Sequence, residues 1–174
     1  MCAGIPVKLS VERLFGRDIE VIEFDQRLRL SDDLAARYPD GVHVVASIRP
    51  IQHGVYLEGV VEGQEVETCA RCLETFERTA RVDIAEAFSE EVPAIDAQFS
   101  DVAPLVGREF DVSELVVQLL EVDEPMAAVC SETCRGICPM CGANRNRERC
   151  DCREPRVDER LAGLAKFLQE PGVN

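Results

Sequence analysis

The spacing of the cysteines constrains this chain more than any other feature of its sequence. Eight of its nine cysteines fall into two groups, a Cys-Ala-Arg-Cys motif in mid-chain and a cysteine-rich segment, residues 130–152. They are Cys69 and Cys72 in the motif and Cys130, Cys134, Cys138, Cys141, Cys150 and Cys152 in the segment. Structural zinc takes four thiolate or imidazole ligands in a tetrahedron, commonly as two close pairs. The pattern therefore predicts bound zinc (Zn2+), with two ions preferred over one.

The composition indicates where such a protein works. No stretch of the 174 residues reaches the roughly 18–20 apolar residues of a membrane-spanning helix, and the amino terminus lacks the apolar core of a signal peptide. We therefore expect a cytoplasmic protein with no membrane partner. Thiols stay reduced in that compartment, which favours metal binding over disulfides. The net charge of −14 disfavours nucleic-acid binding over the whole surface, because it repels phosphate.

Apolar periodicity predicts an α+β fold: an antiparallel β-rich domain with a packed amphipathic helix and a cysteine-rich, zinc-binding carboxy-terminal segment. Weak alternation predicts two strands within residues 5–30, and a short helix follows from Ser31. Strong alternation over residues 42–88 predicts three antiparallel strands, the first bounded by Pro50. The Cys-Ala-Arg-Cys motif then forms the turn between the second and third strands.

The second half of the chain divides into a connection, a helix and the cysteine-rich segment. Residues 89–108 are acidic and aperiodic, and we interpret them as a connection. The apolar stripe over residues 111–123 predicts a helix capped by Asp111. A further helical pattern follows the last cysteine. We accordingly predict a β-rich domain over residues 1–129 and a zinc-binding finger with a terminal helix over residues 130–174.

The eight thiols can be shared between metal ions in more than one way. The Cys-Pro-Met-Cys-Gly turn matches a zinc knuckle, in which glycine lets backbone N–H groups point at the sulfurs. The preferred partition is a long-range site of Cys69, Cys72, Cys130 and Cys134 and a local site of Cys138, Cys141, Cys150 and Cys152. The main competitor is a single site of Cys69, Cys72, Cys138 and Cys141. Iron–sulfur and redox chemistry are less favoured, because the spacing departs from the ferredoxin run and the motif lies between strands.

Arginines make the cysteine-rich segment basic within an acidic chain. Residues 135–153 contain five arginines against two acidic residues. Four of them are candidate nucleic-acid-binding residues: Arg135, Arg145, Arg147 and Arg149. A basic, metal-braced loop can contact phosphates. The alternative is that the arginines offset nearby carboxylates and thiolates, because zinc held by four thiolates keeps a net double negative charge.

A catalytic function finds no support in the sequence. The two histidines, His43 and His53, lie far from the cysteine-rich segment. The chain has no phosphate-binding glycine loop, nucleophile elbow or His-Glu-x-x-His motif. Sites filled by four cysteines also lack the open position of catalytic zinc. We therefore predict a protein that is not an enzyme and has no small-molecule substrate.

The order of these motifs resembles the YceD family, the large ribosomal RNA subunit accumulation proteins. The resemblance lies in Cys69–Leu73, in the helix that follows, and in the CxxxCxGxCPxCGxNxN pattern of the cysteine-rich segment. It implies that the eight clustered cysteines occupy the family's cysteine positions. It also implies a cytoplasmic, non-enzymatic factor in large-subunit ribosomal RNA synthesis or processing. Arg145 departs from the apolar residue common at its position.

The resemblance also implies partners. We expect ribosomal RNA precursor or ribosomal proteins to contact the cysteine-rich segment during ribosome assembly. The alternative is a zinc-stabilised protein-interaction adaptor, whose acidic body binds basic ribosomal or transcription proteins.

Overall fold

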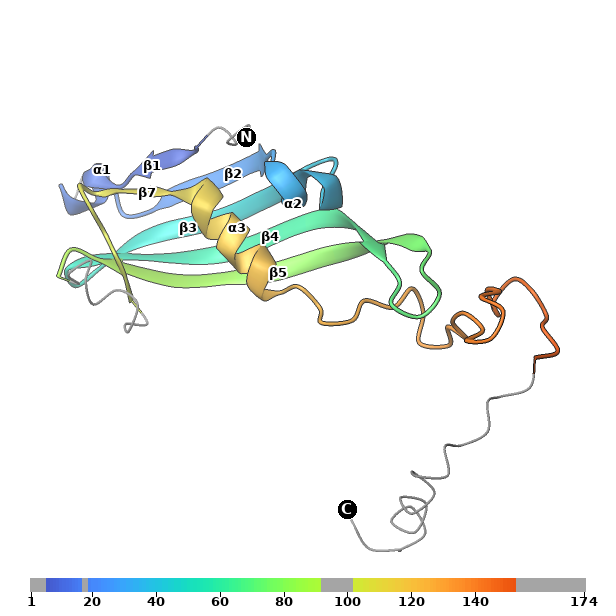
Figure 1. Cartoon of the computed structure of the whole chain (residues 1–174). Coiled ribbons are helices and arrows are strands. Elements are labelled where there is room, and N and C mark those ends of the chain that lie inside the picture. The colour runs from blue at the N-terminus through green and yellow to red at the C-terminus, as the bar shows by residue number, and fades with distance from the viewer. Residues whose placement is uncertain (1–5, 17–18, 92–101, 153–174) are drawn as a thin grey trace, which may run out of the picture.

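The computed structural model describes residues 6–16, 19–91 and 102–152, and its fold is α+β with mostly antiparallel pairing. A five-stranded sheet has the order β2-β3-β4-β5-β6, and a smaller sheet pairs β1 with β7 (Figure 1). The elements are β1 (Lys8–Ser10), α1 (Glu12–Phe15), β2 (Ile22–Leu28), α2 (Asp32–Arg37), β3 (Val42–Ile51), β4 (Gly54–Thr68), β5 (Thr75–Ser89), β6 (Val102–Pro104), β7 (Glu109–Asp111) and α3 (Val112–Val122). We call these elements together the body. No helix among the described residues is long and apolar enough to cross a bilayer.

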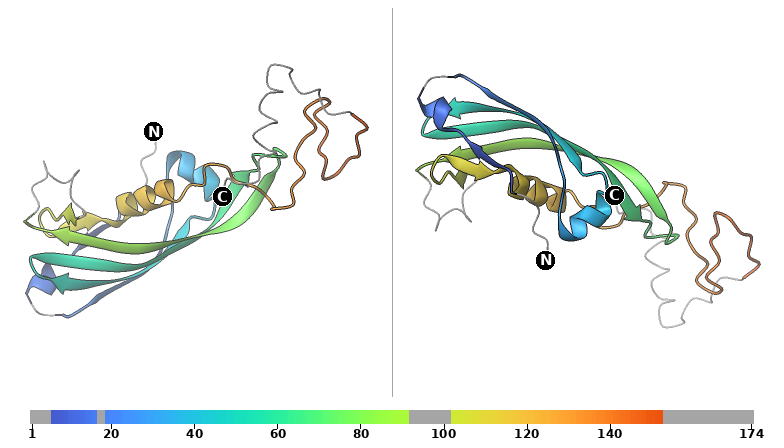
Figure 2. Two further views of the ribbon diagram at one scale, coloured as in Figure 1. Left: turned by 90° about the horizontal axis from the view of Figure 1, so that it is seen from below. Right: turned by 90° about the horizontal axis from the view of Figure 1, so that it is seen from above.

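Helices α2 and α3 lie over one face of the large sheet (Figure 2). Strand residues alternate between the two faces of a sheet, so the apolar member of each pair turns toward the helices. The buried side chains of this core include Val44, Ile48, Val55, Leu57 and Val61 from the strands and Val112, Val116 and Leu120 from α3. Asp111 caps α3 as predicted, because its carboxylate accepts the backbone N–H of Ser113 at 2.8 Å.

The β4–β5 hairpin reaches beyond the rest of the sheet and carries the first cysteine pair. The two strands pair from Gly54↔Ser89 to Thr68↔Thr75, whereas the pairing of β3 with β4 ends at Val42↔Gly63. Residues 64–68 and 75–79 therefore form a two-stranded hairpin extension. The Cys-Ala-Arg-Cys turn lies at its tip, as the alternation predicted.

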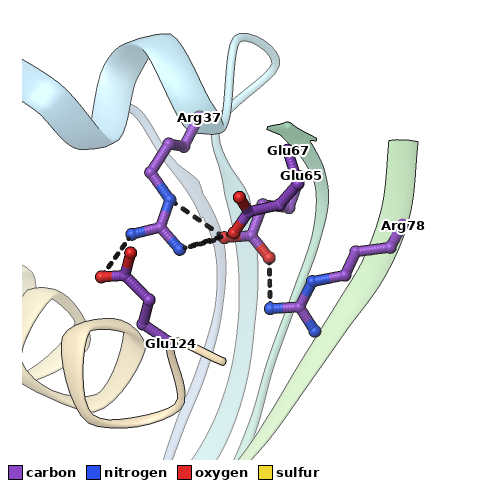
Figure 3. Close-up of polar contacts among 5 residues, drawn as sticks. All are labelled: Arg37, Glu65, Glu67, Arg78 and Glu124. Atoms are coloured by element: carbon purple, nitrogen blue, oxygen red, sulfur yellow. Dashed lines mark hydrogen bonds and ion pairs between the residues drawn. The ribbon is translucent and has the colours of Figure 1, made fainter. Parts of the chain in front are cut away.

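A buried carboxylate ties the hairpin extension to the body. Glu65 of β4 is fully buried and forms ion pairs with Arg37 of α2 and, at 2.5 Å, with Arg78 of β5. Arg37 also pairs with Glu67 of β4 at 3.1 Å and with Glu124, just after α3, at 2.9 Å (Figure 3). One guanidinium thus joins the hairpin, α2 and the end of α3 where the extension begins.

The predicted end of the first long strand was wrong. Strand β3 does not stop at Pro50 but continues to Ile51, with Pro50 opposite Val55. Strand β2 pairs with β3 only as far as Ile48. Beyond that point β3 is a sheet edge, where the missing N–H of proline is tolerated.

The connection predicted over residues 89–108 contains strand residues toward both of its ends. Ser89 still belongs to β5, and residues 102–104 form β6, which pairs in parallel with β5. Three residues are too few to show a period in the sequence. Residues 92–101 and the helical pattern expected after the last cysteine lie outside the described residues.

The two strands expected within residues 5–30 are present as β1 and β2, but they belong to different sheets. Strand β1 pairs with β7, with Leu9 opposite Phe110. The short helix α1 separates the two strands and was not predicted. The helix expected over residues 111–123 is α3, with Asp111 and Asp123 as its caps.

Candidate metal centres

The first four-cysteine cluster forms where the hairpin tip meets the cysteine-rich segment. The sulfurs of Cys69, Cys72, Cys130 and Cys134 all lie within 4.8 Å of one another. The Sγ atoms of Cys69 and Cys134 are 3.9 Å apart, and those of Cys72 and Cys130 are 3.7 Å apart. A tetrahedron with Zn–S bonds of about 2.3 Å has edges of about 3.8 Å. The cluster therefore has the dimensions of a site for one tetrahedral ion.

Arg71 fastens the two halves of this cluster together. Its carbonyl oxygen accepts the N–H of Ile137 at 2.9 Å, and its guanidinium donates to the carbonyl oxygens of Glu132 at 3.0 Å and Cys134 at 3.3 Å. Gly136, with φ of +69°, lets the chains approach, because a Cβ there would lie 2.9 Å from the Arg71 carbonyl oxygen. Arg71 was not among the predicted site residues, and only its position between two cysteines could have indicated this role.

The second four-cysteine cluster is local to the cysteine-rich segment. The sulfurs of Cys138, Cys141, Cys150 and Cys152 also lie within 4.8 Å of one another. The expected knuckle turn is present, because Gly142 has φ of +72° and its N–H donates to the Cys138 carbonyl oxygen at 2.8 Å. This turn directs the N–H groups of Cys141 and Met140 at the Cys138 sulfur, which lowers the pKa of that thiol to about 6.

The thiol pKa values show that each cluster suits a cation. Backbone N–H groups, chiefly that of Cys130, lower the pKa of Cys69 to about 6. Burial and the neighbouring thiols raise the pKa of Cys130 to about 12, and the Cys141 thiol does the same for Cys152. At least one thiol of each cluster ionises readily, and its negative charge opposes ionisation of a neighbouring thiol. A divalent ion among the four sulfurs removes that opposition.

Asn146 connects the two clusters. Its Nδ2 donates to the Sγ of Cys134 at 3.3 Å, which lowers the pKa of that thiol, and its Oδ1 accepts the N–H of Arg135 at 2.8 Å. Asn144 orients it by accepting the Asn146 N–H at 2.9 Å. The residue lies between Cys141 and Cys150 of the local cluster but supports a ligand of the long-range one. Such partners around a metal site orient the ligands and raise affinity.

The four candidate nucleic-acid-binding arginines do not share one environment. A guanidinium nitrogen of Arg145 donates a hydrogen bond to the Sγ of Cys138 at 3.9 Å, and this bond raises the pKa of the guanidinium. Arg147 forms an ion pair with Glu74 at 2.9 Å. Three of the four, Arg135, Arg145 and Arg149, line one hollow of about 380 Å³ beside the second cluster. Charge compensation therefore accounts for Arg145 and Arg147, whereas Arg135 and Arg149 face the hollow.

The structure groups the thiols as the preferred partition predicted and not as the competing single site. Cys150 and Cys152 join one cluster despite their unusual spacing. The short sulfur–sulfur distances suit one ion better than an iron–sulfur cluster, which places several atoms between its thiolates. Four sulfur donors with no other ligand are typical of a structural metal site. Each cluster can therefore hold one metal ion.

Fold and site together define an α+β protein with two four-cysteine clusters, the first of which attaches the cysteine-rich segment to a hairpin tip. The chain belongs to the YceD family, described as large ribosomal RNA subunit accumulation proteins, whose model matches residues 57–168. That description names ribosomal RNA accumulation and no catalytic activity.

Relatives occur in bacteria and plants. An uncharacterised protein of Mycobacterium tuberculosis is 27% identical over 152 residues, which cover 86% of this chain and 67% of the relative. The chloroplastic large ribosomal RNA subunit accumulation protein YCED homolog 1 of Arabidopsis thaliana is 24% identical over 174 residues. That match covers 82% of this chain but 54% of the relative, so the chain spans about half the Arabidopsis protein. A search of solved structures found no significant match.

Proposed function

We propose that this protein is a non-enzymatic, cytoplasmic zinc-binding factor in large-subunit ribosomal RNA synthesis or processing, or in ribosome assembly. The family supports the link to large-subunit ribosomal RNA, and the two four-cysteine clusters support zinc. The zinc ligands are all eight clustered cysteines. The ions take part in no reaction. Their role is structural: they hold the cysteine-rich segment in one conformation and join it to the hairpin tip.

One observation carries the proposed contact with ribosomal RNA precursor: arginines converge beside the second cluster. Arg135, Arg145 and Arg149 line the hollow together with Glu148 and Asp151. Arg145 is committed to the Cys138 sulfur. Arg135 and Arg149 are exposed, and neither has an ion-pair partner among the residues that the structure describes. These two guanidiniums are therefore free to bind phosphate groups.

The test is salt-dependent binding of the zinc-loaded protein to a transcript of precursor large-subunit ribosomal RNA. We expect the double variant Arg135→Glu/Arg149→Glu to weaken binding at least about tenfold and to flatten its salt dependence, because two phosphate contacts are lost. The matched control is Arg13→Glu/Arg29→Glu, which makes the same charge change at exposed positions of the body. Equal loss in both variants, or no RNA binding by the unmodified protein, would contradict the proposal.

A second candidate function is a protein-interaction adaptor that binds basic ribosomal or transcription proteins. It is favoured by an acidic, partly apolar groove on the body, which is separate from the hollow that the arginines line.

A further inference from the structure

An open groove of about 820 Å³ lies between α3 and strands β5, β6 and β7. Phe88 and Phe110 stack at 4.6 Å within it and are themselves almost buried. Leu115, Leu119 and Val122 of α3 recur at helical spacing along one wall. Val122 is 86% exposed, so this apolar stripe continues from the half-buried wall into solvent. The groove can therefore bury apolar side chains of another segment.

The charged residues of the groove are all acidic. Glu86, Glu109, Asp111 and Glu114 line it, and no lysine, arginine or histidine does so among the described residues. Asp111 is occupied as the cap of α3. The other three carboxylates form no ion pair within the described part of the chain. On the open face of the sheet, by contrast, two acidic residues of β4 form ion pairs with arginine.

That open face provides the comparison. There Glu58 forms a two-pronged contact with Arg49, at 2.8 and 2.9 Å, and Glu62 forms an ion pair with Arg81. The carboxylates of the groove have no such partners. Their charge is complementary to a cationic ligand.

We propose that the groove docks a basic amphipathic segment of a partner protein. Apolar side chains of the segment pack on the two phenylalanines and the α3 stripe, and its Lys or Arg side chains reach the three unpaired carboxylates. Burial of the apolar face supplies affinity, and the carboxylates select the sign of charge and the orientation. The inference gives the adaptor function a site and a partner chemistry, and it does not depend on RNA contact by the cysteine-rich segment.

Charge argues against two other occupants. A second copy of this chain carries a net charge of −14 and would be repelled by the groove. Residues 153–174 contain four basic and four acidic residues and so bring no excess positive charge. A cationic segment of another protein complements the groove best.

The probe for this proposal is a synthetic amphipathic peptide of Leu and Lys, about four helical turns or roughly 14 residues long. Its control peptide carries Glu in place of every Lys. With the zinc-loaded full chain, we expect saturable binding of the Lys peptide that weakens with added salt, and no binding of the Glu peptide.

Matched variants test the location. Val122→Asp should weaken binding of the Lys peptide at least about tenfold, because it places a charge in the apolar contact, whereas Met126→Asp, fully exposed and outside the groove, should not. Glu114→Lys should weaken it about fivefold, whereas Glu121→Lys, exposed on α3 but outside the groove, should change it less than about twofold.

Four outcomes would overturn the proposal. The first is that the Lys peptide does not bind, and the second is that the variant and its control in either matched pair lose the same peptide affinity. The third is that the protein forms a dimer that Val122→Asp dissociates. The fourth is that Leu161→Asp/Leu164→Asp binds the peptide more tightly than the unmodified protein does. The third would assign the groove to a second copy and the fourth to this chain's own residues 153–174. Arg135→Glu/Arg149→Glu should leave peptide binding unchanged, so failure of the RNA proposal and failure of this one can be distinguished.

Discussion

Asn146 is the side chain through which one four-cysteine cluster supports the other. Its amide lies 3.3 Å from the Cys134 sulfur, while Cys138 and Cys141 of the second cluster precede it by only a few residues. A hydrogen bond to a thiolate stabilises the ionised form that a metal requires. A change at this one position should therefore alter the first cluster, although the residue belongs to the loop of the second.

We predict that Asn146→Ala lowers the zinc affinity of one of the two sites about tenfold to a hundredfold, because a hydrogen bond to a ligand is lost. The stoichiometry at saturating zinc should stay at two. Competition with a chromogenic chelator measures both quantities. Gln118→Ala, which removes an amide from the exposed surface of α3, is the control and should leave both affinities unchanged. Unaltered zinc affinity in Asn146→Ala would exclude this supporting role.

At the scale of elements, the hairpin extension depends on a charge network rather than on a third strand. Beyond the Val42↔Gly63 pair, β4 has only β5 beside it in the described sheet. An isolated two-stranded ribbon is marginally stable in water. Partial burial opposes the charge of Arg37, but Glu65 raises its pKa, so the guanidinium stays charged. The extension is thereby held against α2 and the end of α3.

We predict that Glu65→Gln lowers the free energy of unfolding by about 2–3 kcal/mol, because two partly buried arginines lose their buried counter-charge. Urea unfolding of the zinc-loaded protein measures the change. Glu62→Gln is the control, on the opposite face of the same strand, where the ion pair with Arg81 is exposed. It should cost less than about 1 kcal/mol. Similar losses in both variants would refute a structural role for the buried network.

At the scale of the whole molecule, the two clusters have different mechanical roles. The first joins residues 69–72 to residues 130–134 and so attaches the cysteine-rich segment to the body. The backbone bond from the Ala70 N–H to the Ala128 carbonyl oxygen, 2.8 Å long, lies beside it. The second closes a loop within the segment (Figure 1). Loss of the first should therefore detach the segment, whereas loss of the second should disorder only its loop.

We predict two bound zinc ions in the unmodified protein and about one in both Cys69→Ser and Cys150→Ser, because a structural site needs all four ligands. Elemental analysis measures these values. Hydrogen exchange then separates the variants: exchange of the Ala70 amide should accelerate in Cys69→Ser and stay slow in Cys150→Ser. A stoichiometry of one in the unmodified protein, or equal exchange in the two variants, would contradict the division of roles.

The sequence by itself determined the features that depend on near neighbours. Alternation of apolar residues predicted the long strands, and Asp111 with its apolar stripe predicted α3. The Cys-Ala-Arg-Cys motif was assigned correctly to a turn between strands. The local group of thiols was also predicted, because a knuckle turn such as Cys138–Gly142 is encoded within a few residues, and the four remaining clustered thiols were then assigned to the long-range group.

Only the tertiary structure decided the features whose partners are distant along the chain. Strand β1 is defined by β7, about one hundred residues later, and β6 by its pairing with β5. The roles of Arg71, Asn146 and Glu65 likewise depend on atoms from other segments. Neither a three-residue strand nor a single polar side chain carries a period or a motif. The conformation of such a strand and the contacts of such a side chain are therefore set by the packing of the whole fold, which brings a distant segment beside them.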